Sequence, residues 1–447
     1  MRRLLPMLLS ASALAGCASY HADPLAAPSA TLAAPDPAIL SADAEKLNRP
    51  YLTPQAVDLS GPLTPNALAV LAIISNPDLK AQRAKAGITD AQAFAARLLP
   101  DPTFQGNYDF IVGGPDEFDA FGGQLAIDIN QIRTAHVVRE AGRASKKQVR
   151  LDLAWAEWNT AGQARLQGVR VLALTEALKV AKISAESSQQ LYDAAQRAAG
   201  RGDISGTELD ARRQGLLDSS TKARTAESDL ATARSDLNKL LGLPPSVVLK
   251  LAEPAASPVP PAAETLVTQA VDRRLDLAAL RAGYQVAEAD LHKAVLDQFP
   301  NLSLTLAAAR DTADNYTVGP AIGFTLPLWN RNRGGIATAK ATREQLKAEY
   351  DARLFQTRAE ITAAVNGVET LRRQRAALAG QLPQVERYSD ATTRAAKRGD
   401  LSPATAATAQ QAARDQKLAL MQLDQQIAEQ TIALELLSGG PSEGWTK

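Results

Sequence analysis

The sequence has few of the residues that usually build disulfides, metal sites or aromatic cores. Its 447 residues include one cysteine, Cys17, so no disulfide can form within the chain, and aromatics make up only 4%. The three histidines, His21, His136 and His292, are too far apart in sequence to suggest a metal site. Lys and Arg number 49 against 48 Asp and Glu, so the net charge of +1 gives no reason to expect nucleic acid as a partner.

Signatures of catalysis are also missing. The sequence contains no Gly-x-Ser-x-Gly elbow, no phosphate-binding loop and no cluster of His or Cys. Carboxylates are spread among Lys and Arg, as on solvated helix faces. We therefore expect neither an enzyme nor a resident cofactor or metal. Alanine, the best helix former, is abundant, and this favours long helices packed through small side chains.

The N-terminal residues predict secretion and lipid attachment. Residues 1–3 are positively charged, and residues 4–14 form an apolar run too short to span a bilayer. Leu14-Ala-Gly-Cys17 then resembles the lipobox of bacterial lipoproteins, which predicts a signal peptide at 1–16 and acylation of Cys17. The alternative is an ordinary signal peptide with a chance cysteine. Ala18, by the same resemblance, favours the outer membrane.

After this segment no run of 18 or more apolar residues follows, so any membrane span must consist of β-strands. Residues 17–62 are rich in Pro, Ala and Ser. They predict the lipidated cysteine followed by an extended linker with little structure of its own.

An internal repeat organises the remainder of the chain. Arg201-Gly-Asp-Ile-Ser205 matches Arg398-Gly-Asp-Leu-Ser402, and Asn76-Pro-Asp-Leu matches Arg274-Leu-Asp-Leu. The offset is nearly constant, at about 197–198 positions, as a tandem duplication requires. We assign the first repeat to residues 63–243, a Pro-rich linker to 244–263, the second repeat to 264–441 and a tail to 442–447.

Each repeat reads as a helix, two strands, a very long helix and a returning helix. The expected helices are 77–99, 131–199 and 205–241 in the first repeat, and 264–298, 332–397 and 402–438 in the second. A 65-residue helix would be about 100 Å long, which favours a coiled-coil stalk. The returning helices keep a heptad of apolar residues that agrees with this: Leu209, Leu216, Ala223, Leu230 and Leu237, then Ala406, Ala413, Leu420, Ile427 and Leu434.

Four short segments alternate between apolar and polar residues, at 104–110, 124–130, 301–306 and 318–326. Such alternation is typical of membrane-barrel strands, with apolar side chains toward lipid and polar ones toward the water-filled lumen. The predicted lumen residues are Gln105, Asn107, Asp109, Gln124, Asp128, Asn301, Ser303 and Thr305. The predicted lipid-facing residues include Phe104, Tyr108, Leu125 and Ile127. A small soluble sheet with one wet face would show the same pattern.

Four strands are too few to close a barrel, and an open edge in lipid would leave backbone groups without partners. Several chains must then share one barrel. Two chains would supply eight strands and a lumen filled by side chains, whereas three would supply twelve and leave a pore.

The order of elements and several motifs resemble the TolC-like outer-membrane factor family. The motifs are Asn76-Pro-Asp-Leu79, Leu237-Asn-Lys-Leu-Leu-Gly-Leu-Pro244 and Leu326-Pro-Leu-Trp-Asn-Arg-Asn-Arg-Gly-Gly335, the last being most like the cobalt–zinc–cadmium branch. The resemblance implies a mainly α protein with a membrane β-barrel. The same resemblance implies a homotrimer with a periplasmic α-barrel and a shared twelve-stranded β-barrel. It also implies two partners, a periplasmic adaptor protein and an inner-membrane pump of the resistance-nodulation-division type.

The two Gly-Asp turns acquire a role through this resemblance. Gly and Ser at these positions are ordinary helix-cap chemistry, and the resemblance adds that the tips contact the adaptor. The tip residues are Gly202, Asp203, Ser205, Gly399, Asp400 and Ser402. Where the family's best-known members carry an acidic pair that narrows the aperture, this chain has Thr405 and Thr408. Glu208 and Asp210 are possible substitutes in the first repeat.

We therefore expect an outer-membrane exit duct that is lipid-anchored, projects into the periplasm and serves the export of divalent metal cations. Two alternatives remain open at this point. One is a duct for organic compounds or a secreted product, and the other is a periplasmic coiled-coil scaffold without a pore.

Overall fold

The computed structural model describes residues 20–49, 52, 57–442 and 445, and the chain divides into two units, Met1–Pro35 and Asp36–Lys447. The predicted signal peptide and Cys17 lie outside the described residues. In the first unit, a single helical turn, α2 (Pro28–Thr31), begins with a proline whose fixed φ suits a helix start. All that follows concerns the second unit.

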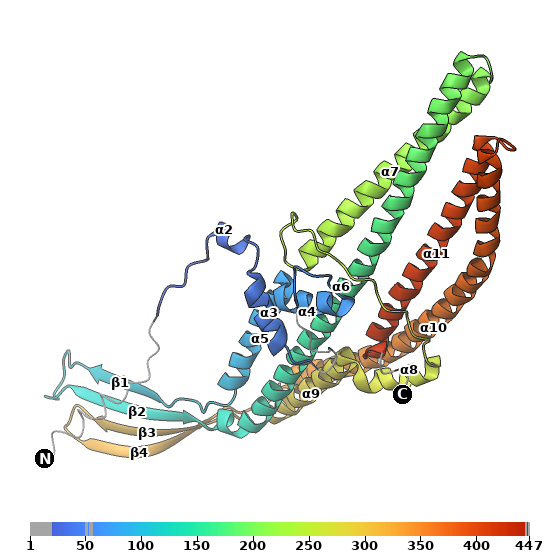
Figure 1. Cartoon of the computed structure of the whole chain (residues 1–447). Helices are drawn as coiled ribbons and strands as arrows, with labels where there is room; N and C mark the ends of the chain where they lie inside the picture. The colour runs from blue at the N-terminus through green and yellow to red at the C-terminus, as the bar shows by residue number, and fades with distance from the viewer. Residues whose placement is uncertain (1–19, 50–51, 53–56, 443–444, 446–447) are drawn as a thin grey trace. The chain divides into compact units, whose positions relative to one another are not determined.

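The second unit repeats one series of elements twice (Figure 1). The first series is α4 (Pro65–Ser75), α5 (Pro77–Ala95), β1 (Thr103–Asp109), β2 (Ala120–Asp128), α6 (Ile129–Gly200) and α7 (Gly206–Leu240). The second is α8 (Ala263–Arg273), α9 (Leu275–Leu296), β3 (Leu302–Arg310), β4 (Tyr316–Phe324), α10 (Arg333–Lys397) and α11 (Pro403–Ser438). The predicted duplicated, mainly helical architecture is confirmed.

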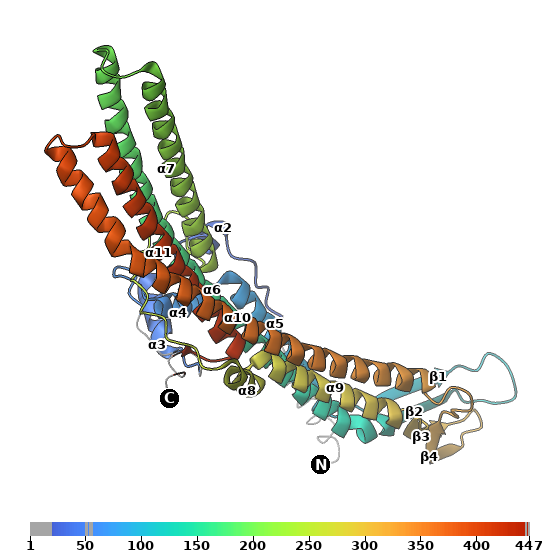
Figure 2. The same cartoon turned by 90° about the vertical axis from the view of Figure 1, so that its right-hand side faces the viewer.

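The long helices agree closely with the sequence prediction. α6 has 72 residues and α10 has 65, and each returns through a short turn into α7 or α11. The predicted heptad residues face the partner helix: Leu230, Leu237, Ile427 and Leu434 are buried. The two helix pairs, α6–α7 and α10–α11, lie side by side in Figures 1 and 2, and α11 packs on α6.

The four strands form one antiparallel sheet in the order β1-β2-β3-β4. The predicted bounds were wrong by a few residues, most at β2, which begins at Ala120 rather than 124. β2 also ends earlier, because Asp128 caps α6: its carboxylate accepts hydrogen bonds from the backbone of Asn130 and Gln131. Strand therefore passes into helix without a loop.

The prediction of one helix over 264–298 is wrong. The helix breaks at Arg274, whose ψ of 121° is extended, and the first repeat breaks in the same way at Asn76 between α4 and α5. At each break, the side chain of the non-helical residue donates a hydrogen bond to a backbone carbonyl near the end of the returning helix. Asn76 Nδ2 donates to Leu240 O at 2.8 Å, and Arg274 Nη1 donates to Leu437 O at 3.3 Å. The periodic apolar pattern continues across both breaks and therefore hides them.

Part of the segment predicted as an extended linker is folded. Helix α3 (Pro37–Lys46) begins at Asp36, whose carboxylate accepts from Ala38 N, and it buries Leu40 and Ala44. Further along, Leu63 N donates to Lys250 O at 2.8 Å, which ties this segment to the linker between repeats. Apolar residues spaced among the prolines let this stretch join the core of α4, α6 and α7.

Candidate functional site: a two-faced sheet and two hairpin turns

The sheet carries its polar side chains on one face. Directly paired residues of antiparallel strands point to the same side, and the register pairs Gln105 with Gln124 and Asp128 with Ser303. By alternation, the same face holds seven of the predicted lumen residues: Gln105, Asn107, Asp109, Gln124, Asp128, Ser303 and Thr305. The eighth prediction, Asn301, was wrong as a strand residue, since it lies one position before β3, where the strand is only beginning to pair.

The opposite face is apolar and open. Phe104 pairs with Leu125, and Leu125 pairs with Leu306. Their side chains are exposed by 74%, 43% and 55% within the single chain, and Val318, Ile322 and Phe324 of β4 extend the surface. A contiguous apolar surface of this kind marks contact with a membrane or a partner.

The charges on the polar face are all acidic. Among the described strand residues that the register places there, Asp109 and Asp128 are charged, and none is Lys or Arg. Asn107 Nδ2 donates to Asp109 Oδ2 at 3.1 Å, which holds that carboxylate along the strand. The rest of this face is largely Gly, Ala, Ser and Thr, so it offers a smooth polar surface with a negative potential.

The two hairpin turns at the far ends of α6 and α10 have the same geometry. Gly202 and Gly399 have φ values of 78° and 84°, a left-handed conformation that glycine adopts without a Cβ penalty. After each glycine, the backbone N–H of Asp203 or Asp400 donates to the carbonyl of Ala198 or Ala395 at 2.9 Å. This is the Schellman arrangement that ends a helix and reverses the chain.

Side chains complete the turns in the same way twice. Arg201 Nε donates to Asp203 Oδ2 at 2.8 Å, and Arg398 Nε donates to Asp400 Oδ2 at 2.8 Å. Ser205 and Ser402 then cap the returning helices. The structure thus brings the predicted tip residues together within each turn, whereas their contact with an adaptor stays a prediction.

The residues considered for an aperture gate have ordinary helical partners. Glu208 lies 3.8 Å from Arg212 and donates its backbone N–H to the Ser205 hydroxyl. Thr408 Oγ1 donates to Ala404 O at 3.0 Å. These contacts account for the first turn of α7 and α11, so a gating role for any of these side chains remains a prediction.

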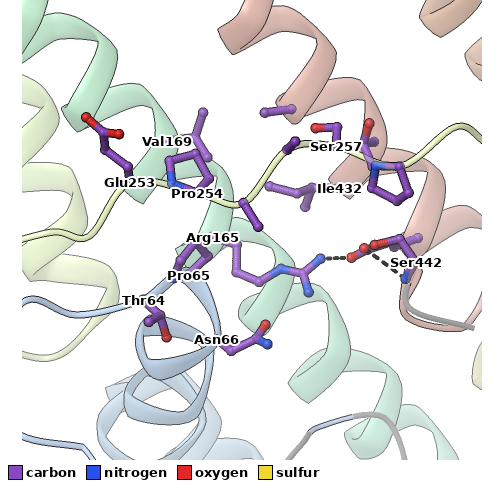
Figure 3. A pocket seen from close by; sticks show the side chains of 16 residues that line it. Thr64, Pro65, Asn66, Arg165, Val169, Glu253, Pro254, Ser257, Ile432 and Ser442 are labelled. Carbon is purple, nitrogen blue, oxygen red and sulfur yellow. Dashed lines mark hydrogen bonds and ion pairs between the residues drawn. The ribbon is translucent and has the colours of Figure 1, made fainter.

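Buried ion pairs between the repeats were not predicted. A cavity of about 560 Å³ lies where α4, α6, α11 and the inter-repeat linker meet. Figure 3 shows side chains that line it. The Arg165 guanidinium reaches across it to the Glu435 carboxylate, which also accepts from Ser442 N at 2.9 Å. Because both side chains are almost fully buried, this pair joins the first repeat to the second. Their charges lie within strongly helical, mixed-charge sequence, so no local pattern marks them.

Two more buried carboxylates are each held by two arginines. Glu157 of α6 binds Arg49 Nε and Arg83 Nη2, both at 2.6 Å. Burial alone would raise the pKa of this carboxyl, but the hydrogen bonds and charges of the two arginines outweigh burial and leave its pKa below the ordinary value. In the second repeat, Asp276 is bound in the same manner by Arg274 and Arg353.

Within the described ranges, no three His, Cys, Asp or Glu side chains come together as a metal site would require.

In that same part of the chain, no helix combines the length and the apolar character needed to cross a bilayer.

The chain is similar in sequence to bacterial outer membrane efflux proteins. Residues 266–440 match the family described as outer membrane efflux protein. The cobalt-zinc-cadmium resistance protein CzcC of Cupriavidus metallidurans is 26% identical over 324 residues, which cover 70% of this chain and 75% of CzcC.

Solved structures share the fold. The CusC structure superposes with a TM-score of 0.68 at 18% identity, covering 91% of this chain and 99% of CusC. The CmeC outer membrane channel of Campylobacter jejuni gives a TM-score of 0.69 at 17% identity, covering 88% and 94%. At these identities the likeness establishes the fold: helices that continue into a small sheet, as in TolC-like channels.

Proposed function

Since residues 266–440 match the outer membrane efflux protein family and the chain has the fold of TolC-like channels, we propose that it is the exit duct of a three-part efflux system whose cargo is divalent metal cations. Its role as an outer-membrane efflux channel follows from the family. The proposal that the cargo is metal cations rests on the likeness to CzcC, which covers 70% of the chain. The duct itself holds no metal in this proposal, and the inner-membrane pump selects the ion.

The two-faced sheet supports a shared barrel. One chain supplies four strands, whose outer members β1 and β4 leave hydrogen-bonding edges open. Three chains arranged β4 to β1 would close twelve strands, with the apolar face toward lipid and the polar face around water. A homotrimer is therefore the assembly we propose.

The turns suit the opposite end of the duct. α6, with 72 residues, is about 108 Å long, and α10, with 65 residues, is about 98 Å long. The Gly202 and Gly399 turns at their ends therefore lie far from the sheet. We assign these exposed turns to contact with the periplasmic adaptor, which links the duct to an inner-membrane pump. The acidic face of the sheet would meanwhile favour the passage of cations over anions.

Deleting the gene tests the cargo. We expect several-fold lower tolerance of zinc, cobalt or cadmium, because removing the exit closes the only step that carries the ion across the outer membrane. Growth inhibition by graded metal salts, compared with dyes and detergents, is the measurement, in a strain without a related duct. Unchanged metal tolerance with new sensitivity to organic compounds would show that the cargo is organic.

The anchor has a separate test. Cys17→Ser is expected to abolish acylation and to leave uncleaved precursor or material released from the membrane fraction, because the hydroxyl cannot form the thioether to the lipid. Labelling with a palmitate analogue, followed by membrane fractionation, measures both effects. Ala18→Ser is the matched control and should be labelled like the wild type. Persistent labelling of the Cys17→Ser protein would refute the anchor.

A further inference from the structure

One edge of the sheet gathers exposed arginines and large apolar side chains. The register places the start of β1, the end of β2, the start of β3 and the end of β4 along this edge, where each strand joins a helix. Each junction exposes a large apolar side chain: Leu98 by 59%, Ile132 by 47%, Phe299 by 52% and Trp329 by 81%. Trp at the border of an apolar band is typical of a membrane–water interface.

Among the residues that the structure describes, the arginines of this edge have no acidic partner. Within the described residues, none of Arg97, Arg133, Arg331 and Arg333 lies in an ion pair, although many other arginines of the chain do. We call these four residues the basic junction edge. Arg133 stacks over the Phe299 ring at 5.8 Å and donates to Leu296 O at 3.1 Å, so one guanidinium spans two junctions.

Neighbouring acids are occupied or too few to neutralise the edge. Asp128 caps α6, and Asp297 binds Lys293 Nζ at 2.6 Å. Asp101 is a further exposed acid, which leaves the four arginines in excess. The opposite edge of the sheet, at the strand turns, has the reverse character, with Asp116, Glu117, Asp119, Asp311 and Asp314.

The loop that carries Trp329 and Arg331 is held in place rather than left loose. Arg331 and Asn332 have φ values of 46° and 50°, which are unfavourable for residues with a Cβ. Asn332 Nδ2 donates to Ala294 O of α9 at 2.8 Å, and Arg333 Nη2 donates to Trp329 O at 2.8 Å. The strained backbone thus presents an indole and two guanidiniums outward.

We infer that the basic junction edge binds the phosphate groups of anionic glycerophospholipids in the periplasmic leaflet of the outer membrane. The inference rests on the proposed function, which places this edge at the periplasmic surface of the outer membrane. Guanidiniums bind phosphate oxygens through paired N–H donors, while the exposed apolar side chains reach the acyl region. In the proposed trimer, closing β4 onto β1 would bring Arg331 and Arg333 near Arg97 of the next copy. This crowding of like charges favours an anionic phosphate between the copies.

Native mass spectrometry of the full-length protein in mild detergent tests the inference. The protein is offered equal amounts of dioleoyl phosphatidylglycerol and dioleoyl phosphatidylcholine. The wild type should retain phosphatidylglycerol preferentially, and Arg331→Gln with Arg333→Gln should weaken that preference about fivefold for each arginine removed. Arg331→Lys with Arg333→Lys should keep most of it. The exposed control pair on α7, Arg213→Gln with Arg224→Gln, should match the wild type.

Three outcomes overturn the inference. These are equal retention of both lipids by the wild type, an unchanged preference in the Gln pair, or displacement of the lipid by inorganic phosphate, which would make the edge a free-anion site. If the Arg331→Gln, Arg333→Gln variant dissociates to monomers but keeps its lipid preference, the edge contacts a second copy instead.

Conductance in planar bilayers separately tests the duct. Pores formed by a protein without lipid preference would refute this inference alone, and the absence of pores would refute the proposed function.

Discussion

Glu157→Ala is expected to lower the free energy of unfolding by about 3–5 kcal/mol, because it leaves the guanidiniums of Arg49 and Arg83 without their shared carboxylate. Glu157 is only 2% exposed, whereas the side chains of Arg49 and Arg83 are 34% and 30% exposed, so water can replace only part of the lost contacts. Chemical denaturation followed by circular dichroism measures the change. Glu176→Ala is the matched control on the same helix: Glu176 is exposed and pairs with Lys179 at 3.5 Å, so the loss should be below about 1 kcal/mol.

The contribution of Glu157 to stability depends on pH, and the pKa shift fixes the sign of that dependence. The folded-state pKa of Glu157 lies below its ordinary value of 4.5, so the contribution of this carboxylate is complete above that value and is lost as the pH falls through the folded-state pKa. The stability gap between wild type and Glu157→Gln should therefore narrow as the pH falls below about 4.5. A gap that stays constant down to pH ~3 would contradict this origin of the stability.

Leu125→Arg is expected to abolish assembly in the outer membrane. Leu125 is near the middle of the apolar face, between Phe104 and Leu306. An arginine near the bilayer midplane costs about 2–4 kcal/mol in each chain, so three chains of one barrel lose about 6–12 kcal/mol. The measurements are the amount of protein in the outer-membrane fraction and of heat-sensitive oligomer on gels.

The adjacent residue supplies the control. Gln124 lies on the same strand with its side chain on the opposite face, so Gln124→Arg should assemble almost as well as the wild type. Failure of Gln124→Arg together with assembly of Leu125→Arg would mean that the polar face meets lipid. Equal assembly of both variants would show that neither face lies in the bilayer.

The elements built from local chemistry were predictable from the sequence. The turns at Gly202 and Gly399 combine a glycine, an aspartate and a capping serine within a few residues, so the ends of α6 and α10 were placed within one residue. The sheet faces were also predictable, because a period of two sorts the side chains whatever the exact strand bounds. What the faces contact depends on assembly, which one chain's periodicity does not contain.

The tertiary contacts were not predictable in this way. The helix break at Arg274 depends on Asp276 and on Leu437 O, the latter 163 positions away, and no proline or glycine marks it. Glu157 looks like any solvated acid on a helix, and only the fold brings Arg49 and Arg83 to it. The folded part of the N-terminal segment was hidden by its proline content, although Asp36 before Pro37 is a recognisable helix start.

The two long helices differ in how they leave the sheet, and the difference is mechanical. Asp128 is both the last residue of β2 and the cap of α6, so any rotation of α6 passes directly into the sheet. Between β4 and α10, residues 325–332 intervene, and the Asn332 side chain ties this segment to Ala294 O of α9. A rotation of α6 is therefore expected to reach the sheet through one residue. A rotation of α10 is expected to be shared with α9 before it reaches β4.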